Sequence, residues 1–140
     1  MASDYIRLAT REDLPKLLEM IDRFYAAANL DIPLNKDSVA ANMGKLAGVG
    51  GLFVCDTGFI GFQMGEIWYS GDPCGQVVMI WSDKPGTGVK LLKFAAKMAG
   101  KMGAKYFQCN SLLSLEPDKL EKVLNRMGYD RIEHVYMRAL

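Results

Sequence analysis

The sequence predicts a single domain, residues 1–140, of the mixed α/β (α+β) class, with a mostly antiparallel central sheet flanked by helices on both faces. The chain has 140 residues, of which 50% are hydrophobic and 24% charged. That composition supplies one packed core and excludes intrinsic disorder. Strand-like runs and helical stripes follow one another in the order βααβββαβαβ. Consecutive hairpins followed by a βαβ crossover imply a mixed sheet, because a crossover of this kind joins parallel strands.

Composition and termini exclude several classes of protein. Seventeen basic against sixteen acidic residues leave a net charge of +1, so no bulk field attracts nucleic acid or an anionic membrane. Cys55, Cys74 and Cys109 are far apart and form no CxxC, so neither a disulfide framework nor a metal site is predicted. No apolar run reaches the roughly eighteen residues of a membrane span, and charges near the N-terminus argue against a signal peptide. We expect a soluble, cytoplasmic protein.

The first third of the chain predicts a strand followed by two helices. Residues 5–9 alternate between apolar and polar side chains, as in a short strand. Thr10 offers an N-terminal cap to a helix that runs to Ala28, with apolar residues spaced by three and four. Residues 29–35 break this helix, and a shorter, weaker one is expected over residues 37–46.

The middle of the chain predicts three strands in sequence. Residues 52–55 and 59–69 form a hairpin around the turn Asp56-Thr57-Gly58. A nearly continuous apolar run over residues 76–82 suits a strand that is covered on both faces. Glycines within the second strand indicate a bulge or a close backbone approach, namely Gly61 and Gly65.

The last third predicts helix, strand, helix and strand. A helix over residues 89–102 is stopped by a glycine and leads to a strand over residues 106–110. Pro117 is placed to start the next helix and Gly128 to end it. Residues 131–137 alternate again and are expected to form the last strand.

The loop between the 76–82 strand and the helix behind it carries the most chemical information. Gly86 and Gly88 let the backbone approach a ligand, and the free amides of a helix start attract anions. A Walker loop is absent, and a dinucleotide fingerprint would need a third glycine where Leu91 stands. A tight turn without a ligand is the alternative interpretation of the two glycines.

In this loop and in the order of its elements, the sequence resembles the GNAT superfamily of N-acetyltransferases over nearly its whole length. The signature of that family is Arg/Gln-x-x-Gly-x-Gly/Ala between the fourth strand and the third helix, and Gly86 and Gly88 match its two glycine positions. Leu91 and Leu92 match the leucine pair that often follows. The dipeptide Gly128-Tyr129 is similar to the Gly-Phe/Tyr that commonly precedes the final strand of the family.

The resemblance implies binding of acetyl-coenzyme A (acetyl-CoA) as cosubstrate. The strand at Ile80 and Trp81 would bind the pantetheine arm through its backbone, and the loop amides would bind the pyrophosphate. Lys90 or Lys93 is a candidate for the ribose 3′-phosphate, if the lysines of this helix are more than a solvated face. The predicted cofactor-binding residues are Ile80, Trp81, Ser82, Asp83, Lys84, Gly86, Thr87, Gly88, Val89 and Asn110.

Two residues are predicted to carry the acid–base chemistry. Acetyl transfer needs a neutral amine, and Glu66, on the long strand, is a candidate general base, with a solvated sheet residue as its alternative role. Tyr129 is a candidate proton donor, although a tyrosine more often packs its ring. The acceptor amine would bind around residues 24–38 and 66–69.

A second function remains open from the sequence. Asp83 stands where the family has Arg or Gln, and Leu124 stands where many members have a tyrosine acid. The first hypothesis is an N-acetyltransferase that transfers acetyl directly from acetyl-CoA to an amine of a small molecule or protein. The alternative is a catalytically silent GNAT-fold interaction module, with or without bound CoA. A homodimer is compatible with either function.

Overall fold

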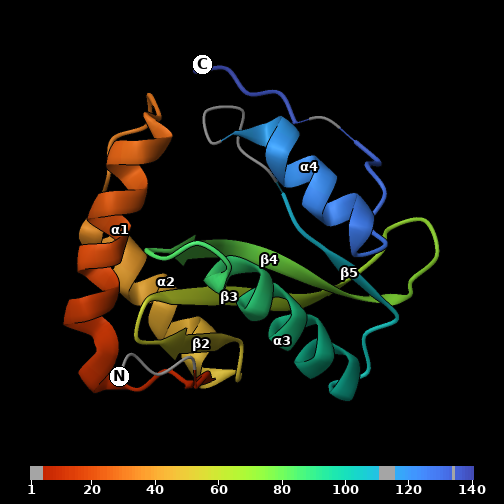
Figure 1. Cartoon of the computed structure of the whole chain (residues 1–140), viewed down its shortest axis with the longest axis horizontal. Helices are drawn as coiled ribbons and strands as arrows, with labels where there is room; N and C mark the ends of the chain where they lie inside the picture. Colours follow the sequence, from red (N-terminus) through yellow and green to blue (C-terminus); the bar gives the residue numbers. More distant parts are fainter. Residues whose placement is uncertain (1–4, 111–115, 134) are drawn as a thin grey trace. The chain divides into compact units, whose positions relative to one another are not determined.

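The computed structural model describes residues 5–110, 116–133 and 135–140 of the chain (Figure 1). The chain divides into two compact units, Met1–Asn110 and Ser111–Leu140, and each is described by itself. The second unit holds one described helix, α4 (Pro117–Arg126). The first unit holds β1 (Arg7–Leu8), the 3₁₀ turn η1 (Arg11–Asp13), α1 (Leu14–Ala28), α2 (Lys36–Gly48), β2 (Leu52–Cys55), β3 (Gly58–Glu66), β4 (Pro73–Ser82), α3 (Thr87–Lys101) and β5 (Tyr106–Gln108).

The sheet of the first unit is mixed and mostly antiparallel, as the sequence predicts. Its strands lie in the order β1-β2-β3-β4-β5. Neighbours are antiparallel except for β4 and β5, which pair in parallel through Cys74↔Tyr106, Gly75↔Phe107 and Gln76↔Gln108. The α3 helix makes the crossover between these two parallel strands.

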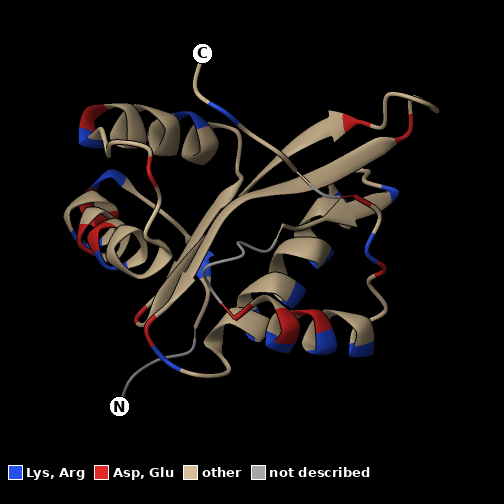
Figure 2. Ribbon diagram, turned by 90° about the horizontal axis from the view of Figure 1, so that it is seen from above, with Lys and Arg blue, Asp and Glu red and all other residues tan. Residues whose placement is uncertain are grey.

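Side chains that alternate along β2 bury both faces of the sheet. Leu52 and Val54 belong to the core cluster that includes Leu17 and Ile21 of α1 and Met43 of α2. Phe53 points the other way: its ring lies 5.0 Å from that of Phe94 in α3 and stacks at 6.1 Å on Phe62 in β3. Helices therefore cover both faces, and charged residues lie on the helices and at the strand ends (Figure 2).

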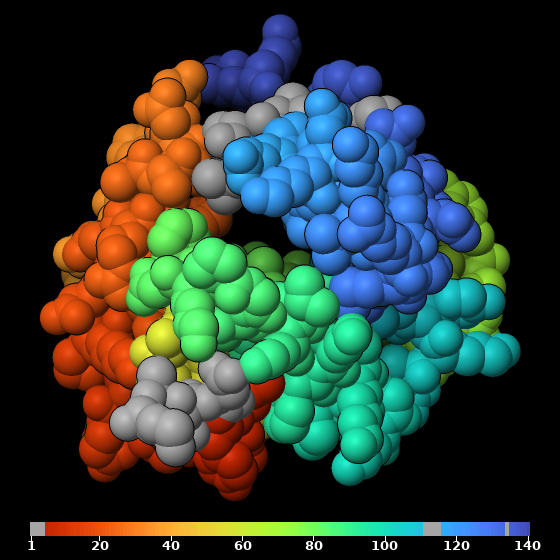
Figure 3. All heavy atoms as spheres, viewed as in Figure 1, coloured from red at the N-terminus to blue at the C-terminus, as the bar shows by residue number. Residues whose placement is uncertain are grey.

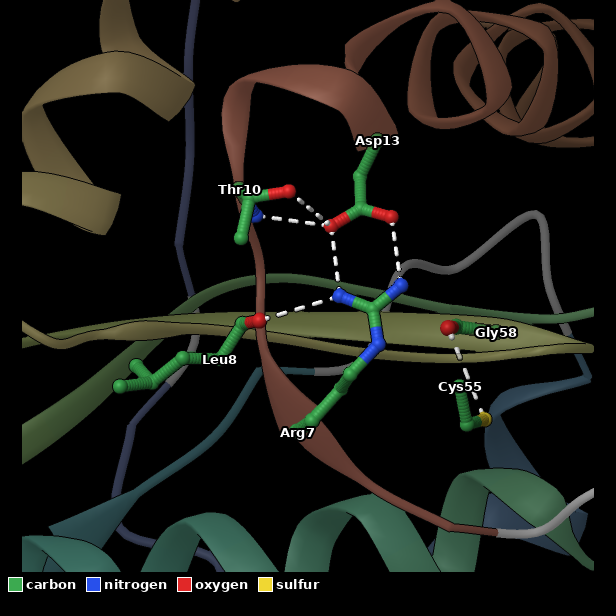
Figure 4. A network of polar contacts seen from close by, with 6 residues as sticks. All are labelled: Arg7, Leu8, Thr10, Asp13, Cys55 and Gly58. Atoms are coloured by element: carbon green, nitrogen blue, oxygen red, sulfur yellow. Dashed lines mark hydrogen bonds and ion pairs between the residues drawn. The ribbon is translucent and has the colours of Figure 1, made fainter.

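An ion pair joins β1 to the start of the first helical segment (Figure 4). Both terminal nitrogens of Arg7 lie 2.7 Å from the carboxylate of Asp13, which also accepts from the backbone N–H of Thr10. These donors hold the pKa of Asp13 well below its usual range, with the Arg7 hydrogen bonds as the largest cause. The predicted capping role of Thr10 is confirmed as a capping box with Asp13.

Most predicted elements are confirmed with shifted ends. The β3 strand stops at Glu66, so Tyr69 lies in a turn that closes through the Ile67 N–H and the Asp72 carbonyl at 2.9 Å. The β5 strand ends at Gln108 rather than at residue 110, and α3 begins two residues earlier than expected, at Thr87. No helix in the described part of the chain combines the length and the apolarity that crossing a membrane requires.

The prediction of a final strand over residues 131–137 is wrong for the residues that the structure describes there. Residues 131–133 and 135–137 form no strand, and His134 lies outside the described residues. Ile132 is 79% exposed and Val135 is 77% exposed. Alternation of side chains defines two faces, but a strand also needs a neighbouring strand to accept and donate its backbone hydrogen bonds.

Candidate functional site

The β4 strand is paired along only part of one edge. The β5 strand pairs with Cys74, Gly75 and Gln76, whereas β4 continues to Ser82. On that side, residues 77–82 have no partner strand among the described residues. Unpaired backbone N–H and C=O groups along a strand edge are a template for an extended ligand.

The hydrogen-bond register shows which residues present their backbone at this open edge. The N–H of Asp83 donates to the Thr57 carbonyl at 2.7 Å, so the backbone of Asp83 faces the β3 side. The pairs Phe59↔Trp81 and Gly61↔Met79 follow at steps of two residues, so the backbone groups of Trp81 and Met79 face β3 as well. Because orientation alternates along a strand, the backbone groups of Ile80 and Ser82 point away from β3, toward the open edge. Ile80 and Ser82 therefore meet the backbone requirement for a pantetheine site, while the Trp81 backbone faces β3.

A bulge lies in β4 beside this open edge. The register shifts between Gly61, which pairs with Met79, and Phe62, which pairs with Val77, so Val78 has no partner residue in β3. A Cβ on Gly61 would lie 2.9 Å from a methyl carbon of Leu46, so the glycine predicted at a bulge also permits close packing of α2. The bulge kinks the strand where the open edge begins.

The loop after β4 ends in a helix start with free donors. Gly86, the N-cap of α3, has a backbone φ of +88°, a conformation that residues other than glycine rarely adopt. Among the described residues, none accepts a hydrogen bond from the backbone N–H of Gly88 or Val89. Two amides and the positive end of the α3 dipole thus face the same loop, which suits an anionic group.

Side chains at both ends of the loop fix its shape. The Thr57 hydroxyl lies 3.1 Å from that of Thr87, whose side chain is buried. Since the Thr57 carbonyl also accepts from Asp83, this turn residue holds both ends of the loop. The Ser82 hydroxyl donates to the Lys84 carbonyl and accepts from its N–H at 3.3 Å. Ser82 and Thr87 therefore shape the loop through their side chains.

Asp83 is joined to α1 by an ion pair that the sequence did not indicate. Its two carboxylate oxygens each accept from Arg23, through Nε and Nη2, at 2.8 Å. Trp81 Nε1 donates to the same carboxylate at 2.8 Å. These donors, Arg23 first, hold the pKa of Asp83 below its ordinary value. In Figure 3 the loop, in bright green, lies beside the orange part of α1.

The remaining predicted site residues belong to other elements of the chain. Glu66 is exposed and pairs with Pro73, at the other end of β4 from Ser82. Ser82 follows Pro73 by nine positions, which corresponds to about 30 Å of extended strand. Asn110 is exposed two residues beyond β5. Tyr129 belongs to the second unit, where its N–H donates to the Leu124 carbonyl at 2.9 Å.

The charges around the loop favour an anion, and the pairing of Asp83 with Arg23 strengthens this preference. Lys84 and Lys90 are exposed on either side of Gly86. With Asp83 neutralised by Arg23, these lysines and the free amides leave the loop with a net positive character. The site can therefore hold an extended chain along β4 that ends in a phosphate group at α3.

Comparison with known proteins identifies this fold. No protein-family model matches the sequence, and a search of curated proteins finds no match. Solved structures match over nearly the whole chain. An aminoglycoside N-acetyltransferase, AAC(6′)-Iy, in complex with CoA has a TM-score of 0.73 at 14% identity, covering 97% of this chain and 93% of that one. An acetyltransferase of Trypanosoma brucei has a TM-score of 0.70 at 17% identity, covering 97% and 99%.

A third structure is similar in the same way. An aminoglycoside acetyltransferase from an uncultured soil metagenomic sample, in complex with sisomicin, has a TM-score of 0.67 at 17% identity and covers 97% of this chain and 96% of that one. These neighbours are GNAT-type acetyltransferases. The chain therefore has the fold of the GNAT superfamily, as its loop and element order predict.

Proposed function

We propose that this protein is an acetyl-CoA-dependent N-acetyltransferase in which residues 1–140 act as one catalytic domain. The observation that carries the proposal is the continuity of the open edge of β4 with the free amides of Gly88 and Val89. A pantetheine arm needs backbone partners along an extended path, and a pyrophosphate needs N–H donors at the end of that path. Solved neighbours with CoA or a CoA-based bisubstrate analogue support the same ligand class.

Each part of the site then has a separate task. Acetyl-CoA supplies an activated thioester. The backbone of Ile80 and Ser82 would bind and orient the pantetheine, and the N–H groups of Gly88 and Val89 would donate to the pyrophosphate. An N–H at the β4 bulge would polarise the acetyl carbonyl, where negative charge develops during attack.

Transfer proceeds by direct attack of the amine. The lone pair of the amine nitrogen forms a bond to the carbonyl carbon, the carbon–sulfur bond breaks, and its electron pair leaves with the CoA sulfur. The nitrogen loses a proton to a base, and the thiolate takes one from an acid. Asp83 is not that base, because Arg23 and Trp81 occupy its carboxylate. Glu66 and Tyr129 stay the predicted base and acid.

The acceptor is an amine whose class the fold does not define. The unpaired thiols of Cys55, Cys74 and Cys109 fit a reducing compartment, and we propose a cytoplasmic location. Since two of the neighbours are aminoglycoside acetyltransferases, the acceptor panel begins with aminoglycosides and adds polyamines, amino acids and peptide N-termini.

Two measurements test the proposal. Native mass spectrometry of the purified protein with acetyl-CoA should show a 1:1 complex, and an assay of free thiol should detect CoA release when an acceptor is added. Replacing Gly88 by Trp should abolish the complex and leave the fold intact, since among the described residues only Ser82 lies within 4 Å of a Cβ built there, at 3.8 Å. Absence of a complex at high micromolar acetyl-CoA would refute the proposal.

A CoA-binding protein without transferase activity is the second candidate. It is favoured by the position of Glu66 at the far end of β4 and by Leu124 where a tyrosine acid is common in the family. The same assay separates the two functions. Binding of acetyl-CoA with no thiol release across the amine panel would support the second candidate.

A further inference from the structure

The entrance to the loop carries a negative charge in an unfavourable place for an anionic ligand. Asp83 follows β4 directly and precedes the Gly86 N-cap by three residues. Its side chain is 30% exposed, so water and salt screen its charge only in part. A carboxylate in this position would repel a diphosphate bound at the N-terminus of α3.

The structure supplies a countercharge from a distant part of the sequence. Arg23 lies sixty residues earlier, on α1, and its guanidinium binds both carboxylate oxygens in a fork at 2.8 Å. Trp81 Nε1 adds a third donor. The edge-on contact between Phe24 and Trp81, with ring centroids 6.1 Å apart, joins the neighbouring residue of α1 to the same place. Two consecutive residues of α1 therefore hold the loop entrance.

We propose that Arg23 is a positioning residue of the cofactor site, which neutralises Asp83 and holds its carboxylate against α1 so that the loop binds the diphosphate of CoA. This inference rests on the proposed function. Arg23 acts through Asp83 rather than on the phosphate. The planar guanidinium suits this task, since it satisfies both oxygens at once, as a lysine ammonium cannot.

The charges around the pair fit this assignment. Lys16 adds a smaller favourable interaction with Asp83, and Glu19 and Asp22 lie near Arg23 and raise its pKa, after the larger effect of Asp83. Arg23 thus stays fully charged, and the pair is neutral as a unit. An isolated surface ion pair contributes little to folding, so the main effect of this one should be on the ligand.

A double-mutant cycle tests the inference. CoA affinity is measured by calorimetry for the wild type, Arg23→Gln, Asp83→Asn and the double variant, at low and at high salt. Arg23→Gln should bind CoA about three- to tenfold more weakly at low salt, the effect of one partly screened charge, and the loss should shrink at high salt. Asp83→Asn and the double variant should both bind within about twofold of wild type, because no unpaired carboxylate remains.

Two further variants sharpen the cycle. Arg23→Lys keeps the cation without the fork and should lose less affinity than Arg23→Gln. Lys105→Gln removes an exposed ion pair with Asp72, at 3.3 Å, and serves as the matched control with unchanged affinity. Arg23→Met, which keeps the apolar stem, replaces the glutamine variant if that one does not fold.

The outcomes separate this inference from the proposed function. If the wild type binds no CoA, the proposed function fails and this inference fails with it. If the wild type binds CoA and Arg23→Gln binds equally well, only the inference is wrong. A double variant as weak as Arg23→Gln would also overturn it, because Arg23 would then act independently of Asp83.

Discussion

The conformation of Gly86 yields a prediction that connects backbone geometry with ligand binding. Its φ of +88° lies in the left-handed region, and a Cβ built there meets no atom of the described residues within 4 Å. Gly86→Ala therefore tests backbone strain without steric overlap. The left-handed region costs a residue with a Cβ about 1–2 kcal/mol, which for a chain of this size lowers the melting temperature by about 3–8 °C.

The effect on CoA should be larger than the effect on folding alone implies. Relief of the strain would move φ to negative values and turn the N–H groups of Gly88 and Val89 away from their common target. A hydrogen bond to a charged group contributes about 1.5–3 kcal/mol, so loss of one such bond weakens CoA binding by about tenfold or more. Calorimetry with CoA and thermal unfolding of the same sample measure the two effects.

Gly71 provides the matched control for this experiment. It has φ of +72° and, like Gly86, no atom from the described part of the chain within 4 Å of a built Cβ, but it lies in the turn between β3 and β4. Gly71→Ala should lower the melting temperature by a similar amount and leave CoA affinity unchanged. Equal loss of affinity in both variants, or a Gly86→Ala variant as stable as the wild type, would refute the reasoning.

Three further predictions concern the core and the N-terminal ion pair. Asp13→Asn should lower the free energy of unfolding by about 1–2 kcal/mol at pH 7. The effect is no larger because Arg7 is half exposed and solvent screens the ion pair. Because the pKa of Asp13 is lowered in the folded state, its contribution to stability is present above about pH 4 and is lost as pH falls through that folded pKa. Urea unfolding should therefore give wild type and Asp13→Asn increasingly similar free energies of unfolding in acid. Tyr25→Phe should leave stability unchanged or raise it by up to about 1 kcal/mol, since the buried Tyr25 hydroxyl has no hydrogen-bond partner among the described residues; a loss above that size in urea unfolding would contradict this. Phe62→Ala should cost about 3–5 kcal/mol in the same assay, because Phe62 is 0% exposed between two aromatic rings, and a cost below about 1 kcal/mol would count against the core described here.

The elements that could be predicted from the sequence are those with a strong local signal. The apolar stripe of α1 and the turn Asp56-Thr57-Gly58 each encode their structure within a few residues, and both are confirmed. The alternating residues 131–137 carry a strand signal as well, but a ladder depends on a partner far away in sequence. Periodicity is local information: it predicts which side chains of a segment share a face, but it does not predict which strand the segment pairs with.

The candidate site likewise combines features that have a local sequence signal with features that depend on residues far apart in sequence. Gly86 and Gly88 are predicted as site residues because a glycine pair before a helix is a local pattern with a physical reason. The ion pair of Arg23 with Asp83 could not be predicted, because nothing near Arg23 in sequence indicates that its guanidinium reaches Asp83. The one available signal is Asp83 itself, because an acid at the entrance of a predicted anion-binding loop suggests a compensating cation elsewhere in the chain.

The position of bound CoA tests the central claim most directly. In a ¹⁵N-labelled sample titrated with CoA, we expect the largest changes in amide chemical shift at Ile80, Ser82, Gly88 and Val89. The amide of Leu52, in the buried β2 strand, should move little. Saturable shifts at another surface of the protein, with these four amides unmoved, would contradict the account.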